Sequence, residues 1–151
     1  MNKAFVKEDA EGLSEVLPDR EISHHANLVT EEGLAQIEEA IAKLQTQQAE
    51  ADASEGNATS LARDLRYWTT QRALAQLTPN SGTSQVRFGC RVTVERGDGR
   101  KETYRIVGVD EADPKHGTLS YVSPLAQALI DHEIGDTIEV GATKRRIIEI
   151  A

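Results

Sequence analysis

The sequence predicts an α+β fold, in which an N-terminal antiparallel α-helical hairpin, a coiled coil, is followed by an antiparallel β domain with one short helix. Two observations lead to this prediction. Before residue 78, apolar residues recur at alternating spacings of three and four, and from Gln85 they recur at every second position. The stretch Pro79-Asn80-Ser81-Gly82 between the two patterns is typical of a helix stop. We expect an extended arm over residues 1–27, the hairpin over 28–80 and the β domain over 81–151.

The composition favours function through a protein partner. The chain has 151 residues, 38% of them hydrophobic, and a formal net charge of −8. Nucleic-acid backbones are bound by clustered Lys and Arg, so this acidity is a poor match for autonomous nucleic-acid binding. Acidity is more typical of docking on a basic surface of a larger machine. The sequence has no apolar run of membrane-helix length and no signal-peptide pattern, so we expect a cytoplasmic monomer with no membrane partner.

The first 27 residues predict an irregular arm, because charges, Gly12, Pro18 and the pair His24-His25 interrupt it. Its few apolar side chains, among them Leu17 and Ile22, could lie against another surface, so we expect an extended and partly docked segment.

Two narrow apolar stripes predict the hairpin. Thr30 suits the N-cap of a first helix that extends to about residue 53, and a second helix follows over residues 58–77. The short break at Gly56-Asn57 makes the helices antiparallel, since neither stripe could stay buried alone. The stripes are Leu34, Ile37, Ile41, Leu44 and Gln48, then Leu61, Leu65, Trp68, Arg72 and Ala75.

Alternation of apolar and polar residues predicts the strands of the β domain. Gly97-Asp98-Gly99 is a tight-turn signal after the first strand, and Pro124 suits the first turn of a short helix that extends to Ile130. The alternating set is Val86, Phe88, Cys90, Val92 and Val94, and further strands are expected at residues 104–107, 119–122, 137–140 and 145–150.

Several groups of reactive or charged residues have structural interpretations. Cys90 is the only cysteine, which excludes an intramolecular disulfide and a cysteine zinc cluster, so it should pack as a small apolar side chain. The four histidines are scattered and are interpreted as solvated. The acids Asp110, Glu111 and Asp113 could form a cation site, but surface acids around a turn are favoured. Lys144-Arg145-Arg146 is interpreted as protection of a sheet edge.

A set of short motifs lies in fixed order between Tyr104 and Asp136. The pieces are Ile106-Val107-Gly108, Asp110-Glu111-Ala112-Asp113, Leu119-Ser120, Ser123-Pro124, Ala126, Ala128-Leu129 and Gly135-Asp136. Together they resemble the C-terminal domain of the bacterial transcript-cleavage factors of the GreA/GreB family. The resemblance covers residues 28–150 and implies a coiled-coil hairpin followed by an FKBP-like β domain.

The resemblance implies a transcription elongation factor that binds bacterial RNA polymerase at the secondary channel and stimulates cleavage of backtracked nascent RNA. The family tip reads approximately D-x-x-E-N-A, and residues 52–58 are similar to it with Gly56 inserted. Asp52 and Glu55 are therefore implied as metal-assisting acids. Such a factor is not itself an enzyme and has no cofactor of its own, because it shares Mg²⁺ with the polymerase. It meets nascent RNA only within the polymerase complex.

Two other functions stay open. Gly56 changes the backbone of the tip, the aromatic residue that follows the family motif is absent, and the second helical arm is short. These departures are compatible with a non-cleaving Gre paralogue that occupies the channel and modulates or inhibits transcription. The FKBP-like domain also suggests a prolyl isomerase, which is disfavoured because only Phe88, Tyr104 and Tyr121 could line an aromatic pocket.

Two further contacts follow from the resemblance. Ser123 and Pro124, with the helix they begin, are implied as the polymerase-docking part of the domain, although Pro124 at a first helical turn has an equally good folding role. Arg63 and Arg66 share a helical face at a spacing of three and could contact RNA or polymerase, but a solvated face is the favoured interpretation.

Overall fold

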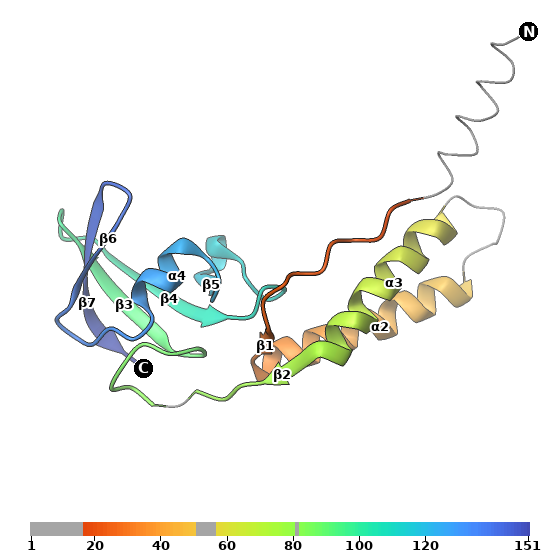
Figure 1. The fold of residues 1–151 in the computed structure, drawn as a ribbon, viewed down its shortest axis with the longest axis horizontal. Coiled ribbons are helices and arrows are strands. Elements are labelled where there is room, and N and C mark those ends of the chain that lie inside the picture. The colour runs from red at the N-terminus through yellow and green to blue at the C-terminus, as the bar shows by residue number, and fades with distance from the viewer. Residues whose placement is uncertain (1–16, 51–56, 81) are drawn as a thin grey trace, which may run out of the picture. The chain divides into compact units, whose positions relative to one another are not determined.

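The computed structural model describes residues 17–50, 57–80 and 82–151. Its contacts divide these residues into two compact units, one of residues 17–24, 37–50 and 57–74 and one of residues 25–36, 75–80 and 82–151. The α+β class is as predicted, with helices first and a curled sheet after them (Figure 1). The predicted bounds of arm, hairpin and β domain stay predictions.

The first unit contains most of the helical hairpin. Helices α2 (Glu31–Glu50) and α3 (Asn57–Leu74) are antiparallel, as the two stripes predict (Figure 1). An ion pair of 3.1 Å between Arg72 Nε and Glu38 Oε1 joins them. Ile37 is buried, but most other stripe residues within this unit are only half-buried. The hairpin therefore has little core of its own.

The second helix is shorter than predicted. It ends at Leu74, and residues Ala75–Leu77 form strand β2, which pairs in parallel with β1 (Asn27–Val29). The expectation that the second helix extends to about residue 77 is therefore wrong. Strands of three residues are too short to show a period, so only their long-range pairing reveals them.

The second unit is built on a five-stranded sheet in the order β5-β4-β3-β7-β6. Its core contains the whole alternating set from Val86 to Val94, including Cys90, which is fully buried as predicted. The strands are β3 (Arg91–Arg96), β4 (Lys101–Val107), β5 (Thr118–Ser120), β6 (Thr137–Val140) and β7 (Thr143–Ile150).

The first half of the alternating set lies outside the sheet ladder. Residues 85–90 precede β3 and form a turn, in which Gly89 N donates to Ile106 O over 2.8 Å and Cys90 N donates to Arg87 O over 3.1 Å. The pattern thus predicts the buried side chains correctly, although it predicts too long a strand. Alternate side chains of residues 86–90 reach the core from a turn that precedes β3.

The sheet is mixed instead of fully antiparallel. Strand β5 pairs with β4 in parallel, with Arg105 opposite Thr118. Residues 108–117 connect them and include the 3₁₀ helix η1 (Pro114–His116). A connection of this length returns the chain to Arg105, so that β5 can run beside the last three residues of β4 in the same direction, which a two-residue hairpin turn cannot achieve.

The position of β7 excludes edge protection as the role of Lys144-Arg145-Arg146. The strand lies between β3 and β6 and is hydrogen-bonded on both sides. The edge-protection interpretation is therefore wrong.

Helix α4 (Pro124–Leu129) lies against the sheet and buries Ala126 and Leu129. Its bounds agree with the predicted short helix to within one residue. None of the helices in the described part of the chain combines the length and apolar character needed to cross a bilayer.

Candidate functional site

The sequence points to two sets of site residues, and only one falls within the described structure. Asp52 and Glu55 lie outside the described residues. Ser123 and Pro124 begin α4, and their surroundings are well defined.

Ser123 caps α4. Its Oγ accepts a hydrogen bond of 3.3 Å from Ala126 N, while its backbone is extended, with φ −67° and ψ 152°. This is the geometry of an N-cap serine, and Pro124 follows in the first turn, where its missing N–H leaves no bond unmade. The Pro124 side chain is exposed. The hydroxyl therefore serves the fold, and Pro124 is free to meet a partner.

Tyr121 supports the segment before this helix. Its hydroxyl donates to Ala26 O, and its ring meets the edge of Phe88 at a centroid distance of 5.7 Å. Gln127 Nε2 donates to Tyr121 O over 2.6 Å, which ties α4 to the same segment. Burial raises the pKa of the Tyr121 phenol, so the hydroxyl stays a donor at neutral pH. The segment before Ser123 and Pro124 is thus held in place by contacts to Ala26, Phe88 and Gln127.

Glu111 has a structural role that the sequence does not predict. Its Oε2 accepts hydrogen bonds from Thr30 N over 3.2 Å and from Gly108 N over 3.1 Å, and its Oε1 accepts from the Thr30 hydroxyl. Thr30 in turn accepts from Gly33 N over 3.0 Å, as the predicted N-cap of α2 should. The carboxylate therefore holds the start of α2 instead of forming a cation site.

The signal for this contact is Gly33, a glycine inside the first helical turn. Glycine is unfavourable within helices, so its presence there indicates a close approach. A Cβ at position 33 would lie 2.1 Å from Glu111 Cδ. Gly108 also allows a close approach, since a Cβ at this position would lie 2.4 Å from Leu28 O.

A second pair links the same helical turn to the sheet. Arg105 Nη2 lies 3.3 Å from Glu32 Oε2. A hydrogen bond from its own backbone N–H lowers the pKa of the Glu32 carboxyl, and the positive charge of Arg105 lowers it further. Together with Glu111, this pair places two carboxylates at the positive end of α2, where negative charge is favourable.

Asp113, another acid of the motif, caps a turn. Asp113 Oδ1 accepts from Lys115 N over 3.2 Å at the start of η1, and its Oδ2 lies 2.5 Å from His116 Nδ1. The hydrogen bond with His116 lowers the pKa of the Asp113 carboxyl. Within the described ranges, no group of three or more His, Cys, Asp or Glu side chains could hold a metal ion.

The polar face of α3 contacts the chain itself. Arg66 Nη2 lies 2.7 Å from Asp19 Oδ1, and Arg63 Nη2 lies 3.2 Å from Asp64 Oδ1. The Arg20 guanidinium lies 3.7 Å from the centroid of the Tyr67 ring, which meets Trp68 edge-on at 5.2 Å. Arg63 and Arg66 thus have partners within the first unit, and residues 19–20 are docked on α3 as the partly docked arm predicts.

The sequence of residues 81–151 is similar to that of proteins of a known family. The family described as "Transcription elongation factor, GreA/GreB, C-term" matches residues 81–151. A transcription elongation factor GreA from Hyphomonas neptunium is 55% identical over 62 residues, which are 40% of this chain and 40% of that protein. GreA from Rhizobium etli is 44% identical over 90 residues, 59% of this chain and 54% of that protein. The chain thus spans about half the length of the curated relatives it matches.

Solved structures are similar at a lower level. GreA factor homolog 1 of Thermus thermophilus is 14% identical and aligns over 84% of this chain and 99% of that one, with a TM-score of 0.43. At this score the likeness to solved structures supports no argument about function. Residues 81–151 therefore match the C-terminal domain of the GreA/GreB family, and the matched relatives are transcription elongation factors GreA.

Proposed function

We propose that this protein is a transcription elongation factor that binds bacterial RNA polymerase at the secondary channel as a monomer. The observation that supports it most is the family match over residues 81–151, together with 55% identity to a protein named transcription elongation factor GreA. The negative net charge of −8 also suits docking on a basic protein surface better than direct nucleic-acid binding. In this proposal the protein contacts nascent RNA only within the polymerase complex.

Pro124 is the proposed centre of docking. The Ser123 hydroxyl is occupied by Ala126 N, whereas the Pro124 side chain is exposed on a helix whose other face is buried through Ala126 and Leu129. An exposed apolar ring on a rigid support loses little conformational entropy when a partner covers it. The domain thus supplies the binding energy, and the hairpin supplies the activity.

The proposed activity is stimulation of the cleavage of backtracked nascent RNA. Asp52 and Glu55 are acids of the type that Mg²⁺ prefers, so their chemistry fits a metal site shared with the polymerase. The ion would supply stabilisation of the charge that develops during hydrolysis by the polymerase itself. In this proposal the factor is an accessory protein with no cofactor of its own.

One observation favours a second candidate, a non-cleaving paralogue that occupies the channel and modulates or inhibits transcription. Helix α3 has 18 residues and ends at Leu74 because residues 75–77 pair with β1. At 1.5 Å per residue it spans roughly 27 Å. A short arm limits how far a tip carboxylate can reach.

A cleavage assay with defined backtracked polymerase complexes tests the proposal. We expect Mg²⁺-dependent RNA shortening with the unaltered protein and its loss with Asp52→Asn or Glu55→Gln, while both variants still bind polymerase. Polymerase binding without any stimulation by the unaltered protein would establish the second candidate. Absence of binding to polymerase would exclude both.

A further inference from the structure

The run Lys144-Arg145-Arg146 lies on an interior strand, where the fold gives it no edge to protect. Arg146 is opposite Glu95 on β3 and Thr137 on β6, and Lys144 is opposite Glu139. Arg145 is opposite Arg96, so two like charges face each other across an antiparallel pair. Such a pair is unfavourable unless an anion lies nearby.

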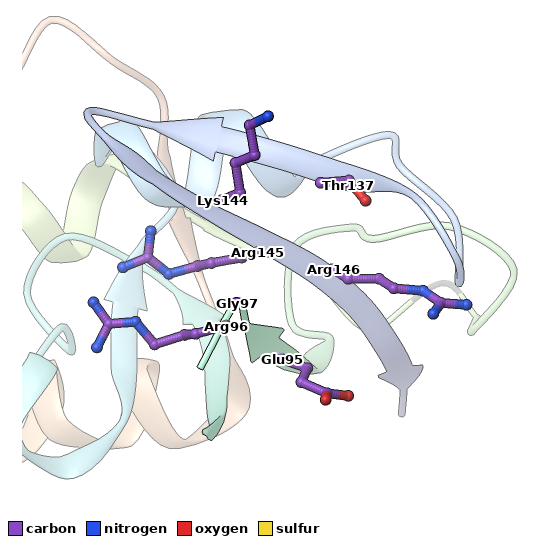
Figure 2. Close-up of a pocket in the computed structure, with 7 residues that line it drawn as sticks. All are labelled: Glu95, Arg96, Gly97, Thr137, Lys144, Arg145 and Arg146. Carbon is purple, nitrogen blue, oxygen red and sulfur yellow. The ribbon is translucent and has the colours of Figure 1, made fainter. Parts of the chain in front are cut away.

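A hollow of about 250 Å³ lies among these side chains. Its lining includes Arg96, Lys144, Arg145 and Arg146 but only one acid, Glu95, in a protein whose net charge is −8. Figure 2 shows Arg96 and Arg145 extending together to one side of their strands and Arg146 and Glu95 extending to the other. The region where β3 ends and β7 begins is therefore cationic, although the protein as a whole is acidic.

One of the two opposed arginines is already neutralised. Arg96 Nε lies 3.1 Å from Glu102 Oε1, and the other oxygen of Glu102 accepts from the Tyr104 hydroxyl. Arg145 differs, because its buried Nε has no hydrogen-bond partner among the residues that the structure describes. Among the described residues, no carboxylate forms an ion pair with Arg145. A buried hydrogen-bond donor without a partner lowers the stability of the folded protein. Arg145 is thus the residue at which an external anion would be most favourable.

We propose that this cationic hollow is a docking site for an acidic segment of a protein partner, in which Arg145 binds a carboxylate and Lys144 and Arg146 strengthen the field. The guanidinium fork matches a carboxylate with two parallel hydrogen bonds. The neighbouring Arg96 also lies beside a carboxylate, through a single ion-pair contact of 3.1 Å between Arg96 Nε and Glu102 Oε1. The volume suits a side-chain carboxylate and is below the usual range of a cofactor pocket.

Nucleic acid fits this surface less well. Binding a nucleic-acid backbone requires cations that follow many phosphates, whereas here the cations are confined to one end of two strands. Acidic residues border them, among them Asp98 and Glu139. A single acidic side chain or a short acidic peptide avoids these neighbours.

The test is a titration of the ¹⁵N-labelled protein with a hexaglutamate peptide, followed by NMR of the backbone amides and the arginine Nε–Hε groups. We expect saturable shifts at residues 95–97 and 144–146 and at Arg145 Nε. The variant Arg145→Gln should bind about fivefold more weakly, as expected for loss of a part-exposed ion pair. Gly97→Glu should also weaken binding, because a side chain there meets open space beside the cations and brings its own carboxylate.

The matched control is Arg100→Gln, which removes the same charge from an arginine that is 78% exposed in the neighbouring turn. Its affinity should stay that of the unaltered protein, and amide spectra establish that each variant is folded. An equal loss in Arg100→Gln would overturn the proposal, since only the general field would then matter. Equal shifts with a hexaglutamine peptide, or tighter binding of hexathymidylate at the same residues, would also overturn it.

Discussion

The Glu111 carboxylate accepts hydrogen bonds from the backbone N–H and the hydroxyl of Thr30, a residue 81 positions earlier in the chain. The same hydroxyl accepts from Gly33 N, so it is donor and acceptor at once. Glu111 therefore fixes the N-cap of α2 by orienting the hydroxyl that performs the capping. The first turn of the helix is stabilised by the β domain as well as by its own sequence.

Replacement of Glu111 by alanine should destabilise the protein. The change leaves Thr30 N and Gly108 N without their acceptor, and we expect a loss of about 1–3 kcal/mol in the free energy of unfolding. Urea denaturation followed by circular dichroism measures it. Glu149→Ala, which removes an exposed acid from β7, should leave the free energy nearly unchanged. Equal stability of the two variants would contradict the capping role.

Gly33→Ala should also destabilise the protein, although alanine is normally the better helix residue. The added Cβ would lie 2.1 Å from Glu111 Cδ, so the carboxylate must move and its hydrogen bonds with Thr30 weaken. We expect a cost of about 1–3 kcal/mol. Gly97→Ala, where a Cβ meets nothing within 4 Å, is the control. The double variant Gly33→Ala/Glu111→Ala should lose less free energy of unfolding than the two single variants lose together, because both changes act on one contact.

Arg20→Ala should loosen the segment that lies on α3. The guanidinium lies 3.7 Å above the Tyr67 ring and 5.8 Å from the Trp68 ring, and a contact of this kind is worth about 0.5–1 kcal/mol. The chain has a single tryptophan, so fluorescence of Trp68 reports on this site alone. We expect altered emission and faster proteolysis within residues 17–24. Glu21→Ala changes an exposed residue of the same segment and should alter neither the emission nor the proteolysis. Identical results for Arg20→Ala and Glu21→Ala would refute the contact of Arg20 with the two rings.

The contribution of Glu32 should depend on pH. Its pKa is lowered from an ordinary value of 4.5, so the ionised form is favoured in the folded state. The stabilisation is therefore present above about pH 4.5 and is lost as the pH falls through the lower pKa of the folded state. The difference in unfolding free energy between the unaltered protein and Glu32→Gln should be constant near neutral pH and shrink in acid. In an Arg105→Gln background part of the difference should remain, because the largest cause is the hydrogen bond from the Glu32 backbone.

Substitutions at Ser123 and Pro124 should distinguish a role in folding from a role in docking. Ser123→Ala removes the cap of α4 and should cost about 1 kcal/mol of stability. Pro124→Ala changes an exposed ring in a first helical turn and should leave thermal stability nearly unchanged while weakening polymerase binding. The measurements are thermal denaturation and a pull-down with purified polymerase. If Pro124→Ala binds polymerase like the unaltered protein, Pro124 is not a docking residue.

Local patterns in the sequence predicted much of the fold. The alternation from Val86 to Val94 identified the buried side chains, because burial on every second residue is a property of the segment itself. The Thr30 cap and the helix start at Pro124 were also recognisable, since each signal acts within a few residues of its own position. The sequence predicted less of the candidate site than of the fold. Asp52 and Glu55 lie outside the described residues, and the roles of Glu111 and Arg145 depend on partners that are distant in the sequence.

The sequence by itself determined the class of fold, the order of the two long helices and the β domain, and the resemblance of residues 81–151 to a known domain, because period, caps and ordered motifs are read over a few neighbouring residues. Only the tertiary structure decided that Ala75–Leu77 is a strand, that β5 is parallel to β4 and that Glu111 binds the Thr30 hydroxyl that caps α2. It also decided that Arg145 faces Arg96. Each of these depends on a hydrogen bond or a strand register between segments far apart in the chain, and no local preference of either segment specifies its partner.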